Sequence, residues 1–323
     1  MSQQPSQPPS LSSPLKRRAA AKAQANTEGA ASSASSYRAR RMRAGARTSS
    51  WSRIISVPLT YLSASMAVIF AVAMTVGYLA TQWRDVVTVV VTLAVVVFAN
   101  GWSDLVSAPD RMATRTTVTV SGVLAVIAVR LTGDFAAAAF VLGLVVLVAA
   151  VAEMARPTPR EDLAASLSAS TVGSLIAIAG VTWVGLSSSS PWLTISVASC
   201  VVVTCAVVGN QLGSSLRAHA VGALVCGAIG GLILGIIASM VVGQTAIIRM
   251  IFPSFTGVVA PIVAVIFLAM ALGVMIAVVV ALVDVLVGDH HRRHRESAAF
   301  ARGAMKFLLV AVPIYVIVRI GAL

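Results

Sequence analysis

The longest apolar stretch in this chain lies between residues 257 and 287, which read GVVAPIVAVIFLAMALGVMIAVVVALVDVLV. Asp284 is the only charged residue in it. A helix needs ~20 apolar residues to cross the hydrocarbon core of a bilayer. This stretch is longer, and it lacks the alternation of apolar and polar residues that marks the strands of a membrane barrel. It therefore predicts a membrane-spanning helix with enough length to tilt or kink.

The rest of the chain repeats this pattern, because only 11% of its residues are charged and 58% are hydrophobic. A soluble domain usually has about 25% charged residues. In lipid, backbone polar groups must be satisfied internally, which favours helices. We expect an all-α, polytopic integral membrane protein with about nine transmembrane helices, in a range of 8–10. The eight further candidate segments are Ile54–Ala80, Val86–Trp102, Thr117–Val129, Phe135–Ala152, Ser166–Leu186, Trp192–Val208, Ala220–Val242 and Phe307–Ile320.

The N-terminal region differs sharply in composition. Residues 1–50 have almost no large apolar side chains, so they cannot bury enough surface to offset the entropy lost on ordering. We interpret 1–50 as a disordered, basic, cytoplasmic tail and 51–323 as the transmembrane helical domain. A basic run in the tail is expected to contact anionic lipids through Arg38, Arg40, Arg41, Arg43 and Arg47. Nucleic acid is disfavoured as a partner, because few aromatic side chains for base stacking lie nearby.

The distribution of Lys and Arg predicts the orientation. With the N-terminus inside and nine alternating segments, 20 basic residues fall on the inner side and 4 on the outer side. Cytoplasmic loops carry an excess of Lys and Arg. We therefore expect a bacterial-type plasma membrane protein with a cytoplasmic N-terminus and an outside C-terminus. In this assignment residues 292–306, with Arg302 and Lys306, form a cytoplasmic basic loop.

Ionisable residues inside a membrane are costly and usually functional. Asp284 is the best single candidate for contact with a proton, a cation or a substrate. The alternative is a carboxylate that reaches the membrane interface or pairs with Arg292 or Arg293. Further candidate intramembrane or interfacial polar residues lie toward the same predicted side: Glu153, Asp104, His219 and Asn210.

Small residues recur every four positions in segment 220–242. On a helix this spacing forms one face along which a second backbone can approach closely. The residues of this predicted packing face are Ala223, Gly227, Gly231 and Gly235.

Signatures of several activities are missing. The sequence has no P-loop, no Ser-His-Asp grouping and no H-E-x-x-H motif, so no catalytic residue is assigned and no cofactor is expected. His290 and His294 are four residues apart, but three nearby arginines would repel a cation, so no metal site is expected.

One layout is shared with a known family. After Arg160 come a small polar turn (Gly209–Gly213), a glycine-rich segment and a late basic stretch before a final apolar segment. This order resembles that of the phosphatidate cytidylyltransferases, which are glycine-rich bacterial membrane enzymes with many spans. Their Gly-x-His-Gly-Gly element is absent, and Gly288-Asp289-His290 is the nearest stretch. The resemblance implies a membrane-embedded enzyme of lipid metabolism, or an inactive relative of one.

Three functions compete on these observations. Many spans, glycine-rich faces and the lack of a catalytic motif favour a permease-like or transporter-like protein for a small solute, and they favour a non-enzyme over an enzyme. The alternatives are the lipid-metabolism enzyme just described and a non-catalytic subunit of a membrane complex. The lipid bilayer is the expected partner, and homo- or hetero-oligomers are compatible with the sequence.

The orientation can be tested with reporters. Alkaline phosphatase fused after Leu323 is expected to be active in a bacterial host, because that enzyme folds only outside the cytoplasm. A fluorescent cytoplasmic reporter at the same position is expected to stay dark. The opposite pair of results would contradict the predicted outside C-terminus.

Overall fold

The computed structural model describes residues 59–80, 83–155, 163–187, 191–212, 215–241, 261–287 and 296–321. These residues all belong to one compact unit, Pro58–Leu323. The predicted tail of residues 1–50 lies outside the described residues.

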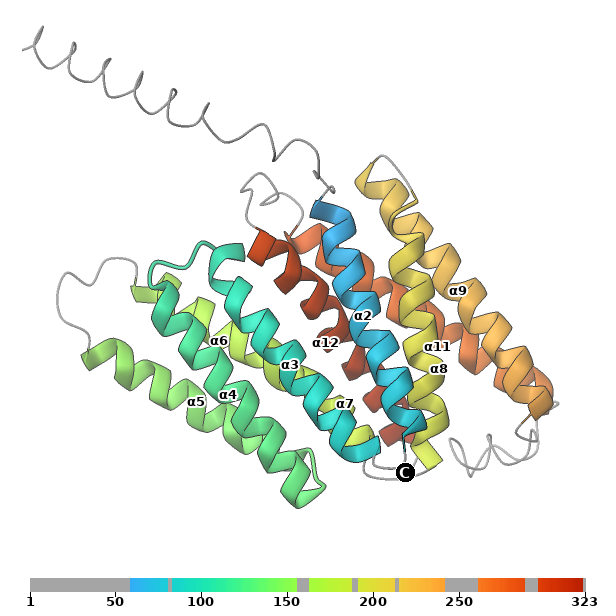
Figure 1. Cartoon of the computed structure of the whole chain (residues 1–323), viewed down its shortest axis with the longest axis horizontal. Coiled ribbons are helices and arrows are strands. Elements are labelled where there is room, and N and C mark those ends of the chain that lie inside the picture. Colours follow the sequence, from blue (N-terminus) through green and yellow to red (C-terminus); the bar gives the residue numbers. More distant parts are fainter. Residues whose placement is uncertain are drawn as a thin grey trace, which may run out of the picture. The chain divides into compact units, whose positions relative to one another are not determined.

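Each apolar segment of the sequence coincides with a helix in the described part of the chain (Figure 1). In chain order the helices are α2 (Leu59–Leu79), α3 (Trp83–Leu105), α4 (Arg111–Thr132), α5 (Ala136–Ala155), α6 (Leu163–Gly180), α7 (Thr182–Leu186), α8 (Pro191–Gly209), α9 (Leu216–Val241), α11 (Pro261–Val287) and α12 (Glu296–Gly321). Helices α6 and α7 form one apolar span, Leu163–Leu186.

The helices have the length and surface that a bilayer requires. Seven helices of the described chain are long and apolar enough to cross a membrane, and two shorter apolar helices, Ala136–Val151 and Ile195–Gly209, accompany them. Large apolar side chains are exposed on the outer faces, among them Leu124, Phe140, Ile229 and Phe267. The predicted all-α, multi-pass membrane fold is confirmed.

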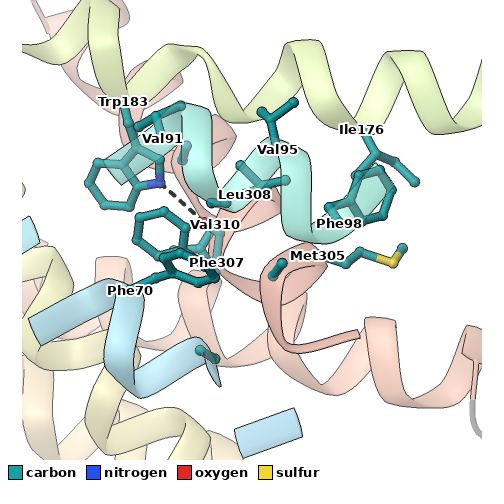
Figure 2. Packing of buried hydrophobic residues seen from close by; sticks show 14 of the residues in the cluster. Phe70, Val91, Val95, Phe98, Ile176, Trp183, Met305, Phe307, Leu308 and Val310 are labelled. Carbon is teal, nitrogen blue, oxygen red and sulfur yellow. Dashed lines mark hydrogen bonds between the residues drawn. The ribbon is translucent and has the colours of Figure 1, made fainter. Parts of the chain in front are cut away.

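Helix α12 lies at the centre of the bundle and contacts α2, α3, α6 and α11. Of its membrane-spanning part, 67% is buried in protein, against 28% for α9 and for α11. Figure 2 shows the aromatic packing around it, where Phe307 stacks on Trp183 and Phe70 at centroid distances of 5.4 and 5.6 Å. The indole Nε1 of Trp183 donates to the carbonyl of Phe307 at 3.1 Å, so this buried polar group is satisfied.

Two helix starts lie furthest from the starts of the predicted apolar segments. Helix α4 begins at Arg111 rather than Thr117, because the side chain of Asp110 caps it by accepting from the Ala113 N–H at 3.0 Å. Helix α12 begins at Glu296 rather than Phe307. The assignment of Arg302 and Lys306 to a loop is therefore wrong. Both side chains are buried in the bundle, where a carboxylate compensates their charge.

The small residues of α9 face α11 at very short range. A Cβ atom added at Gly231 would collide with the Ala269 carbonyl oxygen, and one at Gly227 would lie 2.8 Å from the Gly273 carbonyl oxygen. At Gly235 it would lie 3.0 Å from the Cβ of Ala269. The two backbones thus approach as closely as small-residue faces permit in membrane helices.

This contact predicts a strong asymmetry between neighbouring positions on α9. Gly231→Leu is expected to destabilise the protein by ~1–3 kcal/mol or more, because the side chain has no space against the α11 backbone. The control Leu232→Ile, at a position 37% exposed on the outer face, is expected to be mild. Thermal unfolding in detergent measures both, and an unchanged melting temperature for Gly231→Leu would contradict the packing argument.

Candidate functional site

A small cavity opens among five helices at one end of the bundle. Its volume is about 40 Å³, and its lining residues are Ser63, Asn210, Gln211, Leu216, His219, Asp284, Arg302 and Lys306. The cavity lies where α2, α9 and α12 begin and where α8 and α11 end (Figure 1). By the requirement of ~10–15 Å³ for one water, it has room for roughly three water molecules. Its size therefore suits a few waters or one small ion.

Close backbone packing brings α2 to this cavity. Gly303 sits between the two basic residues of α12, and a Cβ added there would collide with the carbonyl oxygen of Ser63. Only a residue without a side chain lets α2 approach α12 at this level. Ser63 can therefore line the same cavity as Arg302 and Lys306.

Asp284 holds the centre of the site. Arg302 Nε donates to its Oδ1 at 2.8 Å, and Arg302 Nη2 lies 2.8 Å from the same oxygen. The Lys306 ammonium lies 2.7 Å from Oδ1 and 2.9 Å from Oδ2. Arg302 and Lys306 are four residues apart on α12, so both extend from one helix face toward α11.

Two cations share one carboxylate in this cluster, because Arg302 and Lys306 both pair with Asp284. Solvent screens little of their charge, since the Lys306 side chain is 1% exposed and the Asp284 side chain 11%. A buried ion pair withstands desolvation only when its geometry and hydrogen bonds are good. Two buried cationic side chains and one carboxylate thus line the cavity together.

Asn210 connects α8 and α9 to this cluster. Its side-chain amide donates from Nδ2 to Asp284 Oδ2. Its backbone carbonyl lies 2.5 Å from His219 Nδ1. A carbonyl only accepts, so Nδ1 carries the proton, and Nε2 of the neutral ring is left as an acceptor.

The amide oxygen of Asn210 is the exception in this network. Asn210 is 2% exposed, and its Oδ1 has no hydrogen-bond partner among the described residues. A buried acceptor without a donor costs about 1–3 kcal/mol. This atom is an unsatisfied polar group in a residue that lines the cavity.

The structure brings together three of the polar residues singled out in the sequence: Asp284, Asn210 and His219. Asp104 belongs to a different cluster, where it lies 3.3 Å from Arg111 Nη1 and accepts from Ser297 Oγ at 2.8 Å. That cluster joins α3, α4 and α12. Glu153 lies in α5, and its side chain is outside the described residues, as are Arg292 and Arg293.

Sequence reasoning missed Arg302 and Lys306 as site residues. The signal was their four-residue spacing within an alanine-rich stretch, 296–306, that contains no proline and suits a helix. Among the described residues, no three His, Cys, Asp or Glu side chains lie close enough together to hold a metal ion. His290 and His294 lie outside those residues.

The buried pairing predicts a large stability effect at Asp284. Asp284→Asn is expected to cost ~3–5 kcal/mol, because it removes the carboxylate that pairs with two buried cations. Asp85→Asn is the matched control. It breaks the exposed 2.6 Å pair with Arg130, and such pairs are worth ~0–1 kcal/mol. Equal melting temperatures for the two variants would show that the Asp284 cluster does not hold α11 to α12.

Comparisons with known proteins return no relative for this fold and site: no family model, no curated protein and no solved structure matches the chain.

Proposed function

We propose that this multi-pass membrane protein is permease-like and that its solute is a small anion bound at the Asp284 cavity. The observation that carries the proposal is a cavity inside an apolar bundle that two buried cations, Arg302 and Lys306, line together with one carboxylate, Asp284. Ionisable groups inside a membrane bundle are costly and are found where a protein moves or binds charge. A bound anion would accept hydrogen bonds from the Lys306 ammonium group.

The position of the cavity supports entry from one side. The cavity sits at the end of the bundle where α2 begins, which is the side that the positive-inside rule assigns to the cytoplasm. The N-terminus would then lie inside and the C-terminus outside, in a plasma membrane of bacterial type. The basic tail would meet the anionic lipid of the same leaflet.

Asp284 would act as the counter-ion of the empty site. Its carboxylate holds Lys306 at 2.7 Å, so an incoming anion competes with it for the same ammonium group. Such competition weakens anion binding enough for the anion to be released. A permease needs both binding and release of its solute. Because Asp284 is on α11 and Lys306 on α12, an anion that separates them would also loosen the contact between these helices.

A membrane-embedded enzyme of lipid metabolism is the second candidate. It is supported by His219, whose Nε2 is free to accept a proton beside a carboxylate and an ammonium group in one cavity. This candidate predicts turnover of a lipid substrate that depends on His219. The permease proposal predicts charge movement that needs no lipid turnover.

The test is solid-supported-membrane electrophysiology on proteoliposomes of the full chain. Acetate, succinate and inorganic phosphate serve as probes at constant ionic strength, with methylammonium as the cation control. At least one anion is expected to evoke a transient current, and methylammonium none.

Lys306→Met is expected to abolish that current, because it removes the ammonium group for which the anion competes with Asp284. The matched control Arg130→Met removes an exposed cation far along the sequence from the cavity residues and is expected to retain it. Silence with all three anions, or an undiminished current in Lys306→Met, would contradict the proposal.

A further inference from the structure

One histidine, His219, lines the cavity. Its Nδ1–H donates to the Asn210 carbonyl at 2.5 Å, and both the neutral and the protonated ring can keep this bond. It is the one side-chain hydrogen bond of the ring in the described part of the chain, and the residue is only half-buried. Imidazole side chains gain and lose their charge in the physiological range of pH. Nε2 of His219 can therefore take a proton from water that enters the cavity.

Three charged groups share the cavity with this ring. Asp284 of α11 attracts a positive charge on the imidazole, whereas Arg302 and Lys306 of α12 repel one. The other described lining residues are neutral, and Arg217, close to His219 on α9, is exposed to solvent. The proton affinity of the ring therefore responds to any further charge that enters the cavity.

The size of the cavity forces a bound anion close to His219. A volume of about 40 Å³ holds only a few waters or one small ion, so an anion in it contacts or nearly contacts every lining residue. Inside an apolar bundle opposite charges at such short range attract strongly. The anion thus favours the protonated ring, and by thermodynamic reciprocity the protonated ring favours the anion by the same factor. This coupling does not depend on the net charge of the empty cavity.

We infer that His219 binds a proton together with the anion, so that the protein takes up the two as a pair. This inference rests on the proposed anion site and adds its coupling ion. The proton comes from water on the cavity side, binds Nε2 while the anion occupies the cavity, and leaves when the anion leaves. Asn210 holds the parts together, because its carbonyl orients the ring and its side-chain amide donates to Asp284 Oδ2.

Asp284 is the competing site for this proton. An anion that separates its carboxylate from Lys306 removes one cation from its surroundings. The carboxylate would still accept from Arg302 Nε at 2.8 Å and from the Asn210 amide, and both donors favour its ionised form. The imidazole is restrained only through Nδ1, which donates in both protonation states. His219 is therefore the better of the two proton acceptors.

The experiment counts the protons that accompany an anion. Acetate, succinate and inorganic phosphate are titrated calorimetrically into the full chain in nanodiscs, in buffers of different ionisation enthalpy and at constant ionic strength. The dependence of the heat on the buffer gives the protons taken up per anion. At the pH of maximum uptake the unmodified chain is expected to take up roughly half a proton or more in excess of His219→Asn, which corresponds to about a tenfold coupling.

His219→Asn keeps an N–H donor near the position of Nδ1 and removes the titrating ring. A proton taken up by the probe itself cancels in the comparison. The matched control replaces the three other histidines of the chain, His290, His291 and His294, with Asn and is expected to keep the uptake. If His219→Asn fails to fold, uptake in this control that is greatest between about pH 5 and pH 8 assigns the proton to the one remaining imidazole.

Three results would contradict the inference and leave the anion site standing. They are equal uptake in the unmodified chain and His219→Asn, loss of uptake in the triple variant, and uptake that keeps rising below about pH 5, as a carboxylate would give. Binding of none of the three anions would overturn both the inference and the anion site.

Discussion

Helices in a bilayer gain little from burying apolar side chains against one another, because lipid tails are equally apolar. What holds them together is close contact between backbones and the pairing of polar groups. This bundle uses both around α12. Gly101 of α3 lies against the Ser297 carbonyl, and Gly303 of α12 lies against the Ser63 carbonyl of α2. Two ionic contacts of Asp284, with Arg302 and Lys306, join α11 to α12. Helix α9, which also lines the cavity, packs mainly against α11 and α8.

The same contacts that assemble the bundle also create its polar site. A packing contact at Gly303 places Ser63 beside the charges, and a helix end at Asn210 delivers a polar side chain where α8 must stop. Neither buried charges nor an unsatisfied amide oxygen are needed to hold apolar helices together. Proteins tolerate such local costs where function requires them. Among the described residues, the cavity combines both, which is the physical ground for treating it as the candidate site.

Hydropathy was sufficient to predict the helices, because each span must be long, apolar and internally hydrogen-bonded. Asp284 was visible for a related reason, as a single carboxylate in an apolar run. Its partners were not visible. Arg302 and Lys306 follow Arg292, Arg293 and Arg295 so closely that the whole stretch suggests one basic loop. Helical spacing places them on one face, yet it cannot show that α11 brings an acid opposite that face. The unsatisfied oxygen of Asn210 depends on a hydrogen-bond network and has no signature in sequence.

The pairing of α11 with α12 has a consequence for biosynthesis. A charged side chain at the bilayer centre costs ~2.5–3.5 kcal/mol on insertion, and the cost falls toward the interface. Arg302 and Lys306 lie in the first half of α12, so that helix meets part of this cost when it is inserted alone. Lys306 is 1% exposed in the assembled bundle, where it pairs with Asp284. Helix α11 is synthesised before α12. The two helices therefore enter the lipid most favourably as a paired hairpin, which couples their insertion into one event.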